Sequence, residues 1–147
     1  MPSIKNQIMS RVGVLLTTLV TATTAREAKR TKDIFLEAAK LPALHYVDGP
    51  ERVTEQGEDM QGFTMQFPLF IECICADERD PHGTKDALVA AVQTAIEADR
   101  TLNSLANWCR YQSETPFVLE QTKPVVGSVV EYLIEYRRKI ALPSTAY

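Results

Sequence analysis

The stretch FTMQFPLFIECICA at residues 63–76 is the most regular part of the chain and decides its fold class. Its apolar residues recur at every second position, a period of two that predicts a β-strand with one buried face. That face carries Met65, Phe67, Leu69, Ile71, Cys73 and Cys75. The opposite face, which includes Phe70, Glu72 and Ile74, is mixed, so we expect it to be partly covered. Pro68 lacks an amide donor, which favours an edge position or a bulge.

Two helical patterns flank this strand. Apolar residues between Ile4 and Leu19 recur at steps of one, three and four, which predicts a helix that Ser3 caps and that ends near Val20. A second helix is predicted to begin after Thr84 as its cap. Its expected apolar face comprises Ala87, Leu88, Ala91, Val92, Ala95 and Ile96, with Asp86 in the first turn near the positive end of the helix dipole.

Three weaker β patterns complete the chain. Residues 44–47 predict a short strand that stops at Asp48-Gly49-Pro50. Residues 106–113 predict a less regular strand, and an extension through Phe117 and Leu119 is left open. Residues 129–140 alternate clearly, with Val130, Tyr132, Ile134, Tyr136 and Ile140 on one face, after a turn marked by Pro124, Gly127 and Ser128. The order helix, strand, strand, helix, strand, strand predicts an α+β domain. We expect a four-stranded antiparallel sheet, with mixed pairing left open, and two helices on one face.

Two segments show no such pattern. Residues 25–32 contain Arg26, Lys29, Arg30 and Lys32 against Glu27 and are interpreted as a basic connector. A further helical turn is left open at residues 33–39. Residues 48–62 contain Glu51, Glu55, Glu58 and Asp59 and predict a long acidic loop or a flexible hairpin arm. Each segment is either merely solvated or a surface for a partner.

Composition sets broader limits. The chain has 147 residues, of which 45% are hydrophobic and 24% charged, with a formal charge of -3. One domain over residues 1–147 can therefore bury a core without disulfides, and overall charge does not favour nucleic-acid binding. The odd count of three cysteines suits reduced thiols in a cytoplasm. The apolar residues near Val12 to Val20 are too few for a membrane span, and an export signal is the weaker alternative.

No phosphate loop, dinucleotide fingerprint, zinc finger or nucleophile elbow occurs in the sequence. Some side chains could nevertheless carry chemistry. These are Cys109 with His45 or His82 as a nucleophile and base, Asp77, Asp80 and His82 as metal ligands, and Glu131 with Glu135 as an acid–base pair. Core packing, a solvated turn and surface pairing explain these groups more simply. We therefore expect neither an enzyme nor a bound cofactor or metal.

The C-terminal half carries a recognisable combination of motifs. A helix ends in AIEAD at residues 95–99, and TLNSL follows at residues 101–105. An ETP stretch at residues 114–116, Pro124 with Gly127, and YLIEYR at residues 132–137 come after it. With LPAL at residues 41–44 and the N-terminal helix, this pattern resembles the tail-terminator, or minor tail protein U-like, family of long-tailed bacteriophages. The chain departs from the family at Asn103-Ser104, where we expect a glycine after the leucine.

The resemblance implies a virion protein of the tail or neck that is assembled in the host cytoplasm, away from membranes. It implies a ring, most simply a hexamer, that caps the tail tube, ends its polymerisation and presents a surface to a head-completion or connector protein. The unpaired edges of the sheet are the expected contacts between subunits. Other phage neck proteins, or a small cytoplasmic enzyme or ligand-binding domain, are the alternatives.

Within this interpretation, the acidic side chains Glu51, Glu55, Glu58 and Asp59 are expected to meet the tail tube. The basic side chains are expected to face the lumen, the neck or a neighbouring subunit, where they can meet the phosphates of passing DNA. These are Arg26, Lys29, Arg30, Lys32, Arg137 and Arg138.

Overall fold

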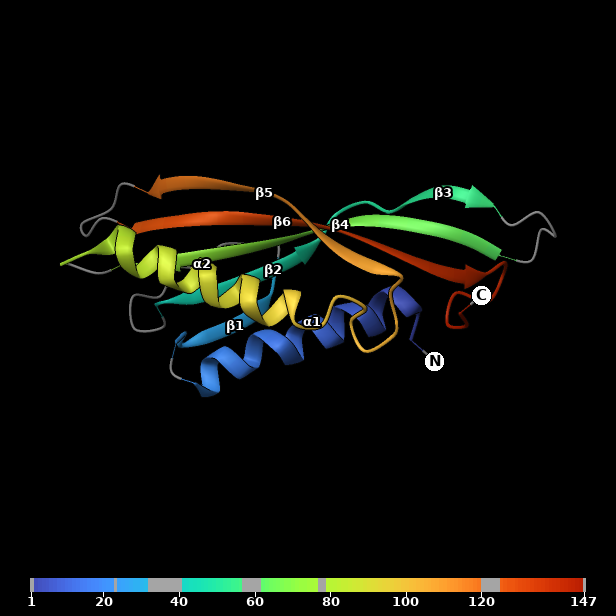
Figure 1. Ribbon diagram of the computed structural model, residues 1–147, viewed down its shortest axis with the longest axis horizontal. Helices are drawn as coiled ribbons and strands as arrows, with labels where there is room; N and C mark the ends of the chain where they lie inside the picture. The colour runs from blue at the N-terminus through green and yellow to red at the C-terminus, as the bar shows by residue number, and fades with distance from the viewer. Residues whose placement is uncertain are drawn as a thin grey trace.

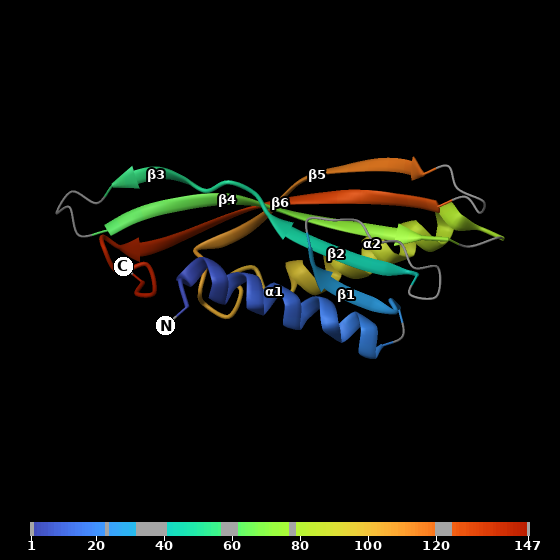
Figure 2. The same cartoon turned by 180° about the vertical axis from the view of Figure 1, so that it is seen from behind.

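The computed structural model describes residues 2–22, 24–31, 41–56, 62–76, 79–119 and 125–146. These residues form one sheet with two helices on one of its faces (Figure 1, and from behind in Figure 2). The elements are α1 (Ile4–Thr21), β1 (Glu27–Arg30), β2 (Ala43–Asp48), β3 (Arg52–Gln56), β4 (Gly62–Cys75), α2 (Pro81–Glu97), β5 (Trp108–Leu119) and β6 (Val125–Lys139).

The long strand predicted from residues 63–76 is confirmed as β4, and it is the central strand of the sheet. It pairs antiparallel with β6 along its whole length, from Gly62 opposite Lys139 to Cys75 opposite Val126. The strand order is β1-β2-β4-β6-β5, and β3 pairs with β4 beyond the end of β2. All pairs are antiparallel except β1 with β2, which is parallel. The α+β class is therefore confirmed, and the sheet is mixed.

The expectation of four strands was wrong, because the described residues contain six. The basic connector contributes β1, and the acidic segment contributes β3, so this segment is a hairpin arm where it is described. Both are short edge strands, and β3 is exposed throughout. An edge strand without a buried face has no reason to alternate, so the alternation of apolar residues could not reveal it. Residues 33–39, where a helical turn was left open, lie outside the described residues.

Pro68 explains why β2 and β3 are separate strands. The expectation of an edge position was wrong, since β4 lies inside the sheet. The Gly49 amide donates to the Pro68 carbonyl at 2.8 Å, so the polar groups of Pro68 face the side of β2 and β3. On this side the missing N–H of proline removes one ladder bond. The pairing of β4 is interrupted there, between Asp48 and Arg52, while the ladder to β6 continues past Leu133.

The core lies between the helices and one face of β4 and β6. Both predicted strand faces are confirmed as buried, from Met65 to Cys75 and from Val130 to Tyr136. α1 begins and ends close to the predicted positions, and the Ser3 hydroxyl accepts from the Asn6 amide as its cap. The principal helix contributions are Ile8, Met9, Val12 and Leu16 from α1 and Leu88, Val92 and Ile96 from α2.

The predicted starts of two elements and one predicted face position were wrong. α2 begins at Pro81 with Asp80 as its cap, because a helix tolerates proline in its first turn; Asp86 therefore lies beyond that turn. Val89 and not Ala87 is buried on α2. β6 begins at Val125, so Gly127 is inside the strand. An added Cβ at Gly127 would lie 2.4 Å from the Phe117 ring, which makes this glycine a packing requirement and not a turn residue.

At its other end, β6 stops at Lys139, so Ile140 lies in the turn that follows the strand and not on its predicted face. This turn brings the end of the chain back to α1, where the Ile4 amide donates to the Pro143 carbonyl at 2.9 Å. One of the unpaired amides of the first helical turn is thereby satisfied.

The turn after α2 has an unusual backbone. Leu102, Asn103 and Ser104 have φ angles of 48°, 60° and 64°, in the left-handed region that favours glycine. Leu102 is fully buried, and the Asn103 amide donates to the Asp99 carboxylate at 3.0 Å, which holds the turn in place. Arg11 of α1 donates to the same carboxylate at 2.9 Å. A glycine after the leucine would adopt this backbone without strain, whereas the chain carries Asn103 and Ser104 there.

We predict that Ser104→Gly raises the free energy of unfolding by about 0.5–1 kcal/mol, because glycine adopts a positive φ without the steric cost that an L side chain pays. Chemical denaturation measures the change. Ser104 is exposed, so Ser104→Ala is a matched control that keeps the strained backbone and is expected to yield no gain. Equal stability of the glycine and alanine variants would contradict the assignment of strain to this turn.

Candidate assembly surfaces

Among the residues that the structure describes, no strand covers either side of the sheet. β5 is the last strand on one side, and along the other side the outermost strands are β1 and, farther along β4, β3. Strand edges of this kind carry unpaired backbone donors and acceptors that can add another strand. Because β1 and β3 differ from β5 in sequence and length, the two sides of the subunit are chemically different surfaces.

The β3 arm consists of β3 and the paired residues 62–66 of β4 and 135–139 of β6. It extends beyond both helices (Figures 1 and 2). Glu51 ties the base of the arm together, because its Oε2 accepts from the hydroxyl of Tyr136 at 2.6 Å. Burial and this bond to the carboxylate raise the pKa of Tyr136. Glu51 thus has a hydrogen-bond partner within the subunit, although it is exposed, as is Glu55 on β3.

A polar ladder crosses the arm on the face of the sheet opposite the helices. Arg52 donates to the Gln66 side chain at 3.2 Å, and Gln66 donates to Glu135 at 3.2 Å. Asn107 donates to the second oxygen of Glu135 at 3.1 Å. Ser113 donates to Glu131 at 3.4 Å on the same face. These contacts support the interpretation of Glu131 and Glu135 as surface partners of neighbouring strands.

The structure brings the predicted acidic and basic groups together on this arm. Glu55, Thr64 and Arg137 lie opposite one another across β3, β4 and β6, and opposite residues share one face of a sheet. Arg138 lies on the other face, with its guanidinium 5.0 Å from the centre of the Phe63 ring. Glu58 and Asp59 lie outside the described residues.

The basic segment near residue 30 is part of the sheet. Arg30 forms an ion pair with Asp48 at 2.8 Å, and Lys5 of α1 reaches the same carboxylate at 3.0 Å. Burial alone would raise the pKa of Asp48, but the hydrogen bonds from Arg30 and Lys5 outweigh burial and lower it. The Arg26 amide donates to the Pro42 carbonyl, and Lys32 lies outside the described residues.

A pocket of about 470 Å³ lies where β5 begins, against the C-terminal end of α2. The Arg110 guanidinium is 4.1 Å from the centre of the Trp108 ring, which holds the charged group in a defined position. The pocket is lined by Glu97, Arg100, Trp108, Cys109, Arg110 and Tyr111. The sequence analysis did not predict this site. The available signal was the spacing of Trp108 and Arg110, an aromatic and a basic residue two positions apart on an edge strand.

The structure does not assemble the catalytic alternative around Cys109. Burial, reinforced by Glu97 and Asp99, raises the pKa of this thiol to about 12. Cys109 lies at the C-terminal end of α2, whereas His82 lies in the first turn of that helix. Asp80 serves as the helix cap, and Asp77 lies outside the described residues. Among the residues that are described, no three or more His, Cys, Asp or Glu side chains are grouped to hold a metal ion.

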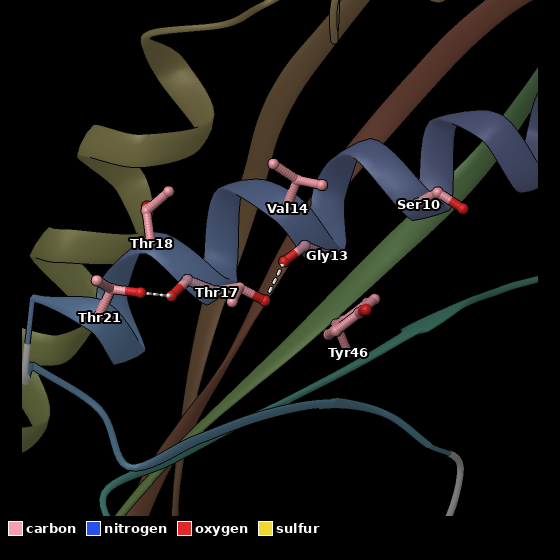
Figure 3. Close-up of a pocket in the computed structure, with 7 residues that line it drawn as sticks. All are labelled: Ser10, Gly13, Val14, Thr17, Thr18, Thr21 and Tyr46. Atoms are coloured by element: carbon pink, nitrogen blue, oxygen red, sulfur yellow. Dashed lines mark hydrogen bonds between the residues drawn. The ribbon is translucent and has the colours of Figure 1, made fainter.

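The exposed side of α1 forms a second hollow, of about 530 Å³, beside Tyr46 (Figure 3). Its helical residues are small, namely Ser10, Gly13, Val14, Thr17, Thr18 and Thr21. The hydroxyls of Thr17 and Thr21 donate to helix carbonyls at 2.7 and 3.3 Å, so they are satisfied within α1.

In the part of the chain that the structure describes, no helix is long and apolar enough to span a membrane.

His45 is buried on the face opposite the helices, with 3% of its surface exposed. It lies opposite Glu72 of β4 and beside Lys29 of β1. Its Nδ1 has no hydrogen-bond partner among the described residues. Burial lowers the pKa of His45; Lys29 reinforces this effect and Glu27 opposes it. Burial also raises the pKa of Glu72.

With the α+β sheet and its open edges in view, known proteins can be compared. No protein-family model and no curated protein matches the chain. A chain of the virion of a native gene transfer agent particle is similar in structure, with a TM-score of 0.47 and 15% sequence identity. The similarity covers 90% of this chain and 91% of that chain. A likeness this distant does not by itself assign a function.

We predict that Tyr136→Phe lowers the free energy of unfolding by about 1–3 kcal/mol, because it removes the hydroxyl that bonds to the Glu51 carboxylate. Glu51→Gln keeps an acceptor and is expected to cost less than Glu51→Ala. Denaturation of the three variants measures these differences. If Tyr136→Phe and the wild type are equally stable, the bond does not hold the base of the arm.

We predict that lowering the pH from 7.5 to 6 destabilises the wild type more than His45→Gln. The pKa of His45 is below its ordinary value of 6.5 in the folded protein, so the unfolded chain takes up this proton first as pH falls. Glu72 acts in the opposite sense, because its raised pKa lets the folded carboxyl take up a proton first. Denaturation at both pH values tests this, and equal slopes for wild type and His45→Gln would contradict it.

Proposed function

We propose that the chain is a structural protein of a bacteriophage-type virion and acts without catalysis as a tail terminator. Copies form a ring, most simply a hexamer, that caps the tail tube, ends its polymerisation and offers a surface to a head-completion protein. The motifs at residues 95–105 and 132–137 support the family, whereas Asn103-Ser104 departs from its glycine pattern at a turn with a left-handed backbone. One structural observation carries the ring: the sheet has two chemically different open edges on opposite sides.

A cyclic ring larger than a dimer needs two different contact surfaces on each subunit. Each subunit must bind one neighbour with one surface and the other neighbour with a different surface. β5 supplies an edge of 12 residues on one side, and β1 and β3 supply edges of 4 and 5 residues on the other. A subunit with a single open edge would pair with a copy of the same edge and stop at a dimer.

The outer end of the β3 arm, where the ends of β4 and β6 pair, is the part of the subunit that we assign to contact with the tail tube, because it extends beyond the helices and carries Arg137. Lys29 is the described residue of β1 that we assign to the neck or lumen. Its ammonium can meet phosphates of passing DNA, whereas Arg30 is already paired with Asp48.

Tail-tube subunits from the same virion test the proposed function directly. We expect tubes that polymerise with this protein present to stop at a narrow range of lengths, with a ring at one end in negative-stain images. Val53→Lys introduces a charge at the β3 edge, where Val53 is 51% exposed, and is expected to abolish capping. Val14→Lys on α1, where the valine is 54% exposed, is the matched control that retains capping. Tubes of unlimited length with the wild-type protein would refute the proposal.

A further inference from the structure

We infer that adjacent copies join by strand addition between β3 of one copy and β5 of the next, with Glu55 opposite Arg110 and Val53 opposite Tyr111. The inference rests on the proposed ring for its partner, a second copy of this chain. It assigns to β3, and not to β1, the contact with the neighbouring subunit.

Strand direction permits this contact. β3 is antiparallel to β4, β4 to β6, and β6 to β5, so β3 and β5 run in opposite directions within one subunit. Rotation about a ring axis repeats the subunit without inverting it. The β3 edge of one copy therefore meets the β5 edge of the next in antiparallel orientation, with the helices of both copies on the same side of the continuous sheet.

The faces of the two strands also agree. Arg52 and Glu55 lie opposite Gln66 and Thr64, on the face away from the helices, and Val53 lies opposite Met65 on the helix side. On β5, Arg110 lies opposite Leu133 on the face away from the helices. Tyr111 lies opposite Tyr132 on the helix side, and Ser113 returns to the other face because Gln112 is an extra residue in a bulge. β3 has a corresponding irregularity at Thr54.

The faces exclude a shift by one position, and the side-chain pairs favour one of the registers that remain. Antiparallel pairing with Glu55 opposite Arg110 places Val53 opposite Tyr111 and Arg52 opposite Ser113, since both irregular positions are skipped. Every pair then shares a face, as cross-strand neighbours must. A shift by one position would place the Glu55 carboxylate on the face opposite the Arg110 guanidinium and would separate Val53 from Tyr111.

The side chains in this register are complementary. Val53 is 51% exposed and Tyr111 is 42% exposed, so each is a large apolar group that the single subunit leaves in water. Glu55 brings a carboxylate to the pocket where Arg110 is held over Trp108 and where Arg100 supplies a second guanidinium. Oppositely charged and apolar cross-strand pairs each stabilise antiparallel pairing.

Cross-linking tests the register. One protein carries Val53→Cys and a short tag, the other carries Tyr111→Cys without the tag, and both are treated with a short bis-maleimide. The native cysteines are buried, so the introduced thiols react first. We expect a covalent heterodimer of the two variants in at least tenfold excess over either homodimer. Val118→Cys on the same strand is the matched control and is expected not to link to Val53→Cys.

Charge reversal provides the second measurement. Glu55→Arg and Arg110→Glu are each expected to weaken self-association by about tenfold in sedimentation experiments, and the double reversal to restore most of the loss. Both positions are exposed, so melting temperatures are expected to stay close to that of the wild type.

The outcomes separate the two proposals. Selective cross-linking with recovery in the double reversal supports the β3–β5 contact. Rings that form and cap tubes without this cross-link overturn the contact and leave the proposed function intact. Absence of rings and of capping under every condition overturns both.

Discussion

The ladder between β4 and β6 is the interaction on which the remaining structure depends. Its 14 residue pairs run without a break past Pro68. The missing amide of this proline faces the other side, so the interruption falls between β2 and β3. Pro68 thereby divides the subunit into two parts. In one part β2 pairs with β4 and the helices cover one face of the sheet, and the other part is the arm that carries β3. The bond from Tyr136 to Glu51 stabilises the arm at this interruption.

The two sides of the sheet follow from the position of this ladder. Because β4 and β6 are central, shorter and more polar strands occupy the outer positions. β5 borders the pocket with Trp108 and Arg110, and β3 presents Val53 and Glu55. Chemical difference between the sides suits contacts that join unlike surfaces of identical subunits. The same difference disfavours uncontrolled pairing of like edges, as do the irregular positions in both strands.

Charge is distributed more locally than the total of -3 indicates. The Asp48 carboxylate forms ion pairs with Lys5 and Arg30 of the same subunit. Arg52 donates a hydrogen bond to Gln66, which in turn donates to Glu135. Glu55 and Arg137 lie opposite a common residue of β4 at the end of the arm. Glu55 and Arg137 are 82 residues apart in the sequence, yet they contribute to one mixed surface and not to two surfaces of opposite sign.

The sequence by itself determined the parts of the fold that carry a buried face. Met65 to Cys75, Val130 to Tyr136 and the helix that begins at Ile4 alternate or repeat because one side of each packs in the core, so their periods were readable. β3 is exposed throughout, and β1 is four residues long with only Ala28 packed against the core, so the pairing of both strands depends on the neighbour that β4 or β2 provides. The pocket at Arg110 likewise requires α2 and β5 to meet. Only the tertiary structure could decide these features, because contacts between distant segments leave no period in the chain.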